Sequence, residues 1–273
     1  MTDYNAPILG PAAPQDSRGA RELWRALCRA LPPADILTIG KSPRVLRGRP
    51  NPLALLRAAT PSQLSGNVID IDGPFDAFTR GFDRKMRKEL GREKRVFEAT
   101  PGARFEIIAD RGEAERVFDR LAEMQAARIR GRGRVYRLDE PEKAEFYRTL
   151  LAEGLKDGNV ALSALRVGDE VVAALLGCIS GDHYAMVRLG QAGAAWGHFS
   201  PGRLIILETM RALRNKGTRR FDFTIGEYDY KRRLGVVTVP LVDVTVALSW
   251  RGGAPVAAAR IRDLARRSAL LRN

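Results

Sequence analysis

The chain has 273 residues, of which 45% are hydrophobic and 29% charged, and its formal net charge at pH 7 is +14. These proportions place it among soluble globular proteins with ample core. Its longest apolar run, at 171–179, is far shorter than the roughly 20 residues of a spanning helix, and no secretory signal precedes it. We therefore expect a cytoplasmic protein without a transmembrane segment. Two cysteines and two histidines, with no CxxC pair, do not make a zinc motif, so we expect no metal.

The first 73 residues contain short apolar elements separated by loops. A helix is predicted where Leu23, Trp24 and Leu27 recur at helical spacing. The predicted elements are strands at 4–9, 35–39 and 67–71 and helices at 18–31 and 51–56. Elements this short hardly form a self-contained core.

A long helix that starts at Pro74 and Asp76 carries the densest charge in the chain. Between Arg80 and Arg95 there are eight basic residues against three acidic ones. One interpretation is a solvated helix face, with the apolar side chains turned inward. The other is a surface for phosphate groups, nucleic acid or another anionic partner. The inward side chains would be Phe75, Phe78, Phe82 and Leu90.

From residue 103 the pattern becomes regular. A strand at 104–108 is followed by two amphipathic helices, at 111–130 and 140–156, whose inward side chains include Phe146. Gly-Asp dipeptides are hairpin signals, so the next three strands should form an antiparallel meander. These strands are predicted at 160–167, 171–179 and 184–189.

The stretch from His198 to Gly235 combines a helix start, a strand and a polar cluster. Ser200 before Pro201 is a typical helix cap, and Gly217 lies where the helix should end. A strand at 220–225 follows. The chain closes with a strand at 239–248 and a helix from about Pro255.

Four segments carry a family resemblance. They are NVALSALRVGDEVVAALLG, HYAMVRLGQA, FSPGRLIILETMRALRNKG and RRFDFTIGEYDYKRRLG. They resemble the second acetyltransferase-type domain of the CelD/BcsL-like (BioF2-like) proteins, which are similar in fold to the Fem aminoacyl transferases. A meander joined through one helix to a parallel strand is also the layout of the GCN5-related N-acetyltransferases (GNAT). The resemblance implies an α+β fold with a GNAT-like mixed sheet flanked by helices, preceded by a partial copy of the same domain.

Domain boundaries follow from the resemblance. It implies a partial first GNAT-like domain at 1–73, a basic linking helix at 74–98, a complete second domain at 99–250 and a basic C-terminal helix at 251–273. The first half of the first domain is missing. We therefore expect an N-terminally truncated gene product or gene model.

The resemblance also implies that acyl-coenzyme A (acetyl-CoA) binds where two central strands separate, with its pyrophosphate at the N-terminus of the central helix. Free N–H groups and the helix dipole favour an anion there. The matching residues are His198, Ser200, Gly202 and Arg203, with Gly226 after the next strand. A proline at the first helical position removes one donor, and Arg203 could compensate by pairing with phosphate. A well-capped helix start without any ligand explains the same residues.

Lys231 is the first catalytic candidate. In Fem-like transferases a lysine at a similar position holds phosphate or stabilises the charge that develops during acyl transfer, and a strand-end lysine suits that role. The alternative is a solvent-exposed start of a short helix.

Asp222 lies between Phe221 and Phe223, so it points to the other face of its strand. A carboxylate on an apolar face is costly unless it is paired, so Asp222 is either a general base or an ion-pair partner of Arg188 or Arg220. Glu227 and Tyr228 are weaker candidates for base and acid, because a tyrosine suits protonation of a departing thiolate. Two further candidates are the histidines: His183 is more simply structural, and His198 precedes the helix.

Two classes of function follow. The first is an acyl-CoA-dependent N- or O-acyltransferase whose acceptor is a small molecule or saccharide, in cellulose, exopolysaccharide or cell-envelope biosynthesis. The second is a catalytically degenerate module that binds an anionic partner through its basic helices. A narrower alternative is Fem-like aminoacyl transfer from charged tRNA.

Overall fold

The computed structural model describes residues 3–226, 231 and 233–270, which divide into two compact units. The first unit combines residues 1–66 with 225–227 and 238–273, and the second combines 67–224 with 228–237. The domain boundaries predicted at 73, 98 and 250 stay predictions. That the first unit is a partial copy of the second stays a prediction.

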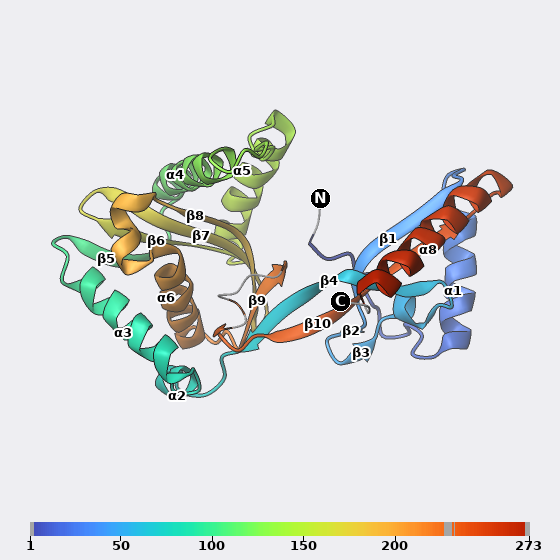
Figure 1. Ribbon diagram of the computed structural model, residues 1–273, viewed down its shortest axis with the longest axis horizontal. Helices are drawn as coiled ribbons and strands as arrows, with labels where there is room; N and C mark the ends of the chain where they lie inside the picture. Colours follow the sequence, from blue (N-terminus) through green and yellow to red (C-terminus); the bar gives the residue numbers. More distant parts are fainter. Residues whose placement is uncertain (1–2, 227–230, 232, 271–273) are drawn as a thin grey trace. The chain divides into compact units, whose positions relative to one another are not determined.

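The second unit is a mixed sheet with helices on both faces (Figure 1). Its strand order is β9-β8-β7-β6-β5, and the end of β4, from Asn67 on, lies beside β9. The strands are β4 (Ala59–Asp70), β5 (Ala103–Ile108), β6 (Val160–Val167), β7 (Glu170–Ser180), β8 (His183–Gln191) and β9 (Arg220–Ile225). The helices are α2 (Phe75–Arg80), α3 (Arg84–Glu98), α4 (Arg111–Arg130), α5 (Pro141–Lys156), the short η2 (Ala194–Phe199) and α6 (Pro201–Asn215).

The two faces of this sheet have separate cores. On one face α2, α3 and α6 pack over residues such as Tyr184, Phe221 and Phe223, and on the other α4 and α5 pack over Leu162 and Leu176. Strands β5 to β8 form the predicted antiparallel meander, and β9 runs parallel to β8. The fold class predicted from the sequence is therefore confirmed: a mixed sheet flanked by helices.

The first unit pairs β1 (Ile36–Pro43) antiparallel with β10 (Val237–Ala247), and β10 neighbours β4, whose residues 59–66 belong to this unit. Its small core lies between α1 (Ser17–Ala30), the short η1 (Pro52–Leu55) and Val244. The remaining elements are β2 (Val45–Leu46), β3 (Arg49–Pro50) and α8 (Trp250–Leu270). Residues 4–9, predicted as a strand, have no regular structure.

Three further predictions about elements are wrong for local reasons. The basic helix is two helices, because Asp83 caps a new one by accepting a hydrogen bond from Met86 N at 2.8 Å. The last helix begins before Pro255, where the Ser249 hydroxyl accepts from Arg251 N at 3.2 Å. Phe146 is 60% exposed, because α5 turns Leu151 and Gly154 to the core instead.

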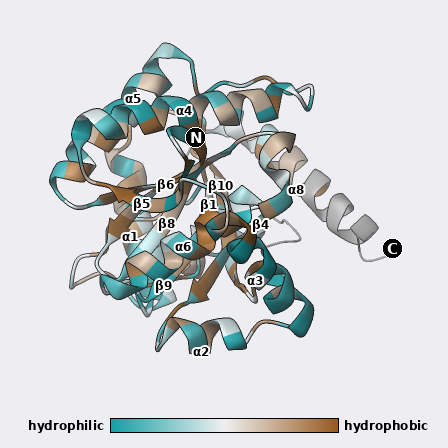
Figure 2. Cartoon of the chain, turned by 90° about the vertical axis from the view of Figure 1, so that its left-hand side faces the viewer, coloured by the Kyte–Doolittle hydropathy of each residue, from teal (hydrophilic) through white to brown (hydrophobic). Residues whose placement is uncertain are grey.

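The basic helix α3 has one apolar and one charged face, as the solvated-face interpretation requires. Met86, Leu90 and Phe97 are buried, and Figure 2 shows the helix as largely hydrophilic. Its exposed basic residues are Arg84, Lys85, Arg87, Lys88, Arg92 and Arg95. Among the described residues, no helix is both long and apolar enough to cross a bilayer.

Candidate functional site

Strands β8 and β9 pair over only three residues and then separate. Parallel pairs join His183 to Arg220, Tyr184 to Phe221 and Ala185 to Asp222. β8 continues to Gln191 and β9 to Ile225 without further pairs between them. Beyond Ala185 and Asp222, the main-chain N–H and C=O groups that face the gap between β8 and β9 therefore need partners other than the neighbouring strand.

A β-bulge lies in β8 just past the point of separation. Leu176 of β7 pairs with Arg188, but the next residue, Gly177, pairs with Met186, so β8 has one extra residue. A bulge bends its strand and changes where the following side chains point, and bulges are frequent beside active sites. Arg188 consequently faces α4 and α5.

Three side chains hold the main chain at the end of β9. Asp222 accepts a hydrogen bond from Thr224 N at 2.6 Å, Lys231 donates to the Phe223 carbonyl at 2.9 Å, and Asn67 donates to the Thr224 carbonyl at 3.1 Å. Thr224 has a φ of 58°, which is strained for a β-branched residue. These contacts therefore maintain a backbone conformation that a threonine at position 224 disfavours.

Lys231 is 2% exposed, so the alternative interpretation, a solvent-exposed helix start, is wrong. Its ammonium group lies at the end of β9, where the family resemblance puts it. Its role in transfer stays a prediction.

Asp222 is 4% exposed and lies within ion-pair distance of a histidine. Its Oδ2 lies 3.4 Å from His183 Nε2. The two predicted arginine partners make their hydrogen bonds to other residues: Arg220 donates to Asp70 at 2.8 Å, and Arg188 donates to Gln125 at 2.9 Å. Asp222 Oδ1 also accepts from the main-chain N–H of Thr224, so both carboxylate oxygens are already engaged.

Side chains of the protein itself fill the N-terminus of α6. Ser200 is at the cap position, but its hydroxyl makes no capping bond, so the predicted Ser cap is wrong. It donates instead to Glu93 at 2.9 Å, and Arg203 also binds Glu93 and reaches Glu89 at 3.2 Å. Glu93 is 2% exposed. An internal carboxylate thus sits where an anionic ligand was predicted.

The main chain at this helix start offers few donors to an anion. Pro201 has no N–H, and the N–H groups of Arg203 and Leu204 both donate to the Ser200 carbonyl. A Cβ at Gly202 would meet Gln191 Oε1 at 1.7 Å, so the Gln191 side chain occupies the space in front of the glycine. Phosphate binding here would require the Glu93 carboxylate to move.

The other predicted site residues are dispersed or undescribed. His198 is exposed in η2, with Nδ1 3.2 Å from the Ala195 carbonyl. Gly226 has a φ of 103°, which favours glycine, and it groups by contacts with the first unit. Glu227 and Tyr228 lie outside the described residues.

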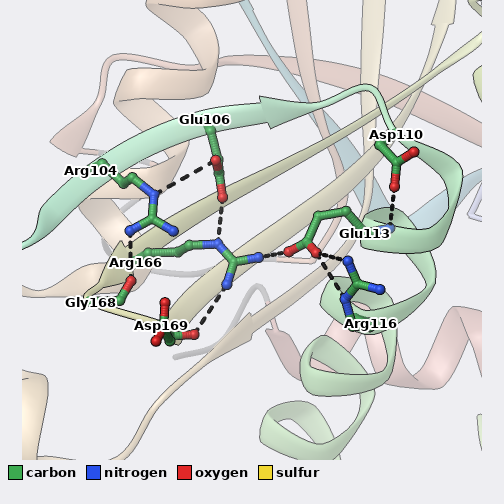
Figure 3. A network of polar contacts seen from close by, with 8 residues as sticks. All are labelled: Arg104, Glu106, Asp110, Glu113, Arg116, Arg166, Gly168 and Asp169. Carbon is green, nitrogen blue, oxygen red and sulfur yellow. Dashed lines mark hydrogen bonds and ion pairs between the residues drawn. The ribbon is translucent and has the colours of Figure 1, made fainter.

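A separate polar network joins β5, β6 and the start of α4 (Figure 3). Arg166 is 8% exposed and binds both Glu106 and Glu113, and it donates to the Asp169 carbonyl at 3.1 Å. Each guanidinium and each glutamate in this network lies beside an opposite charge, so Arg166 has no unpaired charge to offer to a ligand.

The family model described as "Acetyltransferase (GNAT) domain" matches residues 84–232, which is more than half of the chain. The chain belongs to this GNAT acetyltransferase domain family. The match covers α3, both sheet faces and the separating strands β8 and β9. None of the curated proteins compared with this GNAT chain matches it in sequence.

Solved structures share the fold at low identity. The crystal structure of FemX is 11% identical, with a TM-score of 0.58 over 84% of this chain and 77% of FemX. L-PGS from Bacillus licheniformis is 11% identical, with a TM-score of 0.53 over 83% of this chain and 72% of that one. The C-terminal domain of a protein named as a lysylphosphatidylglycerol synthetase, from Agrobacterium fabrum, is 12% identical, with a TM-score of 0.53 over 89% and 75%. These likenesses concern the fold alone.

Sequence reasoning missed two residues that shape the site. Glu93 follows Met86 and Leu90 at helical spacing and precedes Phe97 by four residues, so a carboxylate in an apolar stripe was a readable signal. Asn67 had no such signal, because nothing in its neighbourhood predicts a contact with Thr224, 157 residues away.

Proposed function

We propose that this chain is an acyltransferase that moves an acyl group from acyl-CoA to an amine or hydroxyl of its acceptor. The separation of β8 from β9 beyond Ala185 and Asp222 carries the proposal. It leaves strand edges against which an extended thioester chain can lie, and it begins next to the contact between His183 and Asp222 and to the Phe223 carbonyl that Lys231 binds. Membership of the GNAT family supports the same reaction class.

In this proposal His183 takes the proton of the acceptor nucleophile. Asp222 holds the imidazole through Nε2, so Nδ1 is the atom left to accept a proton, and a base oriented by a carboxylate is a recurrent catalytic arrangement. Asp222 is then a positioning residue. Lys231 stabilises negative charge near the end of β9, and Glu227 and Tyr228 stay candidates for an alternative base and for the acid.

The donor fits this site in part. The separated strands suit its acyl chain, whereas the N-terminus of α6 holds Glu93 in the place of phosphate. Acyl-CoA would supply the activated thioester carbonyl, and Arg203 would exchange Glu93 for a phosphate group. Gly202, Ser200 and His198 would line the same end.

We further propose, from the resemblance to the CelD/BcsL-like proteins, that the acceptor belongs to cellulose, exopolysaccharide or cell-envelope biosynthesis and that transfer occurs in the cytoplasm. A second candidate donor is aminoacyl-tRNA. Glu93 at the N-terminus of α6 favours aminoacyl-tRNA, because a donor without a pyrophosphate would not need this helix end as a phosphate site.

A transfer assay tests the proposal. Release of free CoA thiol from acetyl-CoA, measured with a panel of amines and saccharides, should show turnover, and His183→Gln should lower kcat by about 10²-fold. Transfer from aminoacyl-tRNA alone would establish the second candidate. Binding of anionic polymers with no transfer from either donor would instead support a degenerate binding module.

A further inference from the structure

Arg188 is a buried cation whose described partners are all neutral. The residue is 2% exposed. Its Nε donates to Gln125 Oε1 at 2.9 Å and its Nη2 donates to the Tyr136 hydroxyl. The guanidinium carbon lies 4.9 Å from the Phe118 ring centroid and 4.8 Å from that of Tyr147. Among the described residues no carboxylate pairs with Arg188, and Nη1 has no acceptor.

Two other arginines, the buried Arg166 and the half-buried Arg203, have carboxylate partners instead. Arg166 binds two carboxylates, as Figure 3 shows, and Arg203 binds Glu89 and Glu93. A buried guanidinium is costly unless it is paired, and arginine stays charged in proteins. The positive charge of Arg188 therefore has no negatively charged partner among the described residues.

Neutral groups around Arg188 cannot supply that charge. Burial lowers the pKa of the Arg188 guanidinium, and burial raises the pKa of the Tyr136 hydroxyl, so the phenol stays protonated near neutral pH. Arg130 lies over the Tyr136 ring at 5.7 Å but is paired with Asp139 at 2.5 Å. The cluster as a whole carries a single uncompensated positive charge.

The position of Arg188 relates it to the proposed reaction centre. It follows the β8 bulge, and it lies on the sheet face that carries Asp222 and His183. Ala185, which pairs with Asp222, is three residues before Arg188, so the arginine is on the order of 10 Å further along the strand. Gln125 of α4 and Tyr147 of α5, which both contact Arg188, are only half-buried.

We propose that Arg188 binds a carboxylate group of the acceptor. A carboxylate matches the guanidinium in planarity and in charge, one negative for one positive, whereas a phosphate would bring close to two negative charges against one cation. Binding replaces the neutral contacts of Nη2 and fills Nη1. The proposal rests on the proposed function, since it treats this face of the sheet as the acceptor side.

Thermal unfolding of the full chain in small-anion buffers tests this without turnover. At about 0.1 M and constant ionic strength, acetate should raise the Tm relative to chloride by about 2 °C, and acetamide should not. Arg188→Met should abolish the acetate effect. The matched control is Arg211→Met, which removes a guanidinium stacked on Phe75 at 5.0 Å on the opposite face and should keep the effect.

Several results would overturn the proposal. An unchanged acetate effect in Arg188→Met would do so, and so would an equal or larger response to inorganic phosphate in the wild type. Replacing Arg188 leaves no buried carboxylate without its partner, so the Tm of Arg188→Met should lie within about 2 °C of that of the wild type. A large loss of stability would indicate a structural role for Arg188 instead.

If Arg188→Met does not fold, Arg188→Lys decides the matter. Lysine keeps the charge but loses the planar fork, so it should show a smaller acetate effect than the wild type. A wild-type effect in Arg188→Lys would contradict binding through the fork. An inactive protein that still binds acetate through Arg188 would contradict the proposed function alone, and an active one with no acetate response would contradict this inference alone.

Discussion

At the scale of single residues, the end of β9 stores backbone strain that its neighbours maintain. Thr224 has a left-handed φ of 58°, and Asp222, Lys231 and Asn67 fix the main chain on both sides of it. Strained backbone of this kind clusters at functional sites, where the surrounding structure imposes it. The strain therefore supports a functional role for this strand end.

Thr224→Gly should stabilise the protein by about 1 kcal/mol, because glycine adopts a positive φ without the Cβ clash. Denaturant unfolding would measure the change. Thr149→Gly, in the helix α5, is the control and should lose stability, since glycine is the poorer helix former. A loss of stability in Thr224→Gly would mean that the threonine side chain contributes more than its strain costs.

Tyr184 is a second residue with an unfavourable feature. Its side chain is fully buried beside Phe221 and Gly177, and its hydroxyl has no hydrogen-bond partner among the described residues. Burial raises the pKa of this hydroxyl well above its ordinary value near 10. The folded protein thus keeps a proton that the unfolded chain releases, so this contribution to stability is present below pH 10 and is lost as the pH rises above it.

Tyr184→Phe should raise the free energy of unfolding at pH 7 by about 1 kcal/mol, because it removes an unsatisfied buried hydroxyl. It should also reduce the loss of stability above pH 10. Tyr136→Phe is the contrasting variant, since its hydroxyl bonds to Gln125 and Arg188, and it should destabilise. Equal effects of the two substitutions, measured by unfolding across pH 7 to about 11, would contradict this interpretation.

At the scale of elements, the contact between α3 and α6 controls the predicted donor site. Glu93 of α3 holds Ser200 and Arg203 at the start of α6, and Glu89 is shared by Arg203 and Arg233. The hydrogen bond from Arg233 lowers the pKa of Glu89, so its carboxylate stays charged. Two anions of the protein therefore compete with any ligand phosphate for Arg203.

Glu93→Gln should tighten acetyl-CoA binding by about tenfold, because it removes the charge that competes for Arg203 and for the helix dipole. Titration calorimetry would measure the affinity. Glu98→Gln removes one charge from the same helix, where it pairs only with Lys94 at 3.6 Å among the described residues, and should leave the affinity unchanged. Identical affinities of Glu93→Gln and the wild type would exclude the start of α6 as the phosphate site.

The exposed face of α3 is a second feature at this scale. Lys88, Arg92 and Arg95 lie on one side of the helix. We expect this face to bind anionic partners, so the triple change of these residues to glutamate should weaken binding of a single-stranded oligonucleotide. The slope of log K against log salt should fall in magnitude by about two.

The matched control reverses Arg21, Arg25 and Arg29 of α1, with the same change in net charge. If both triple variants lose affinity equally, net charge alone determines binding and the α3 face has no special part in it.

At the scale of the whole molecule, the order of elements could be read from the sequence because it depends on local signals. Gly-Asp turns marked the meander, and the apolar run after Pro201 marked the central helix. Side-chain partners could not be read. Glu93 meets Ser200 across 107 positions, and His183 meets Asp222 through strand pairing, so both depend on tertiary packing.

The sequence also did not predict which elements pack together into one compact unit. The predicted boundaries followed the family resemblance, whereas the compact units are discontinuous in the chain, with β10 and α8 grouped with the N-terminal segment. Local periodicity does not indicate that C-terminal elements pack with the N-terminal segment.

The central claim is that the separated strands β8 and β9 bind the acyl group of a thioester donor. Calorimetric titration of the folded full chain with acetyl-CoA tests it most directly. We predict saturable binding at high-micromolar ligand or tighter, retained with a truncated donor that lacks the nucleotide but weakened by Thr224→Pro, which alters the strand end. No binding of either donor by folded protein would contradict the claim.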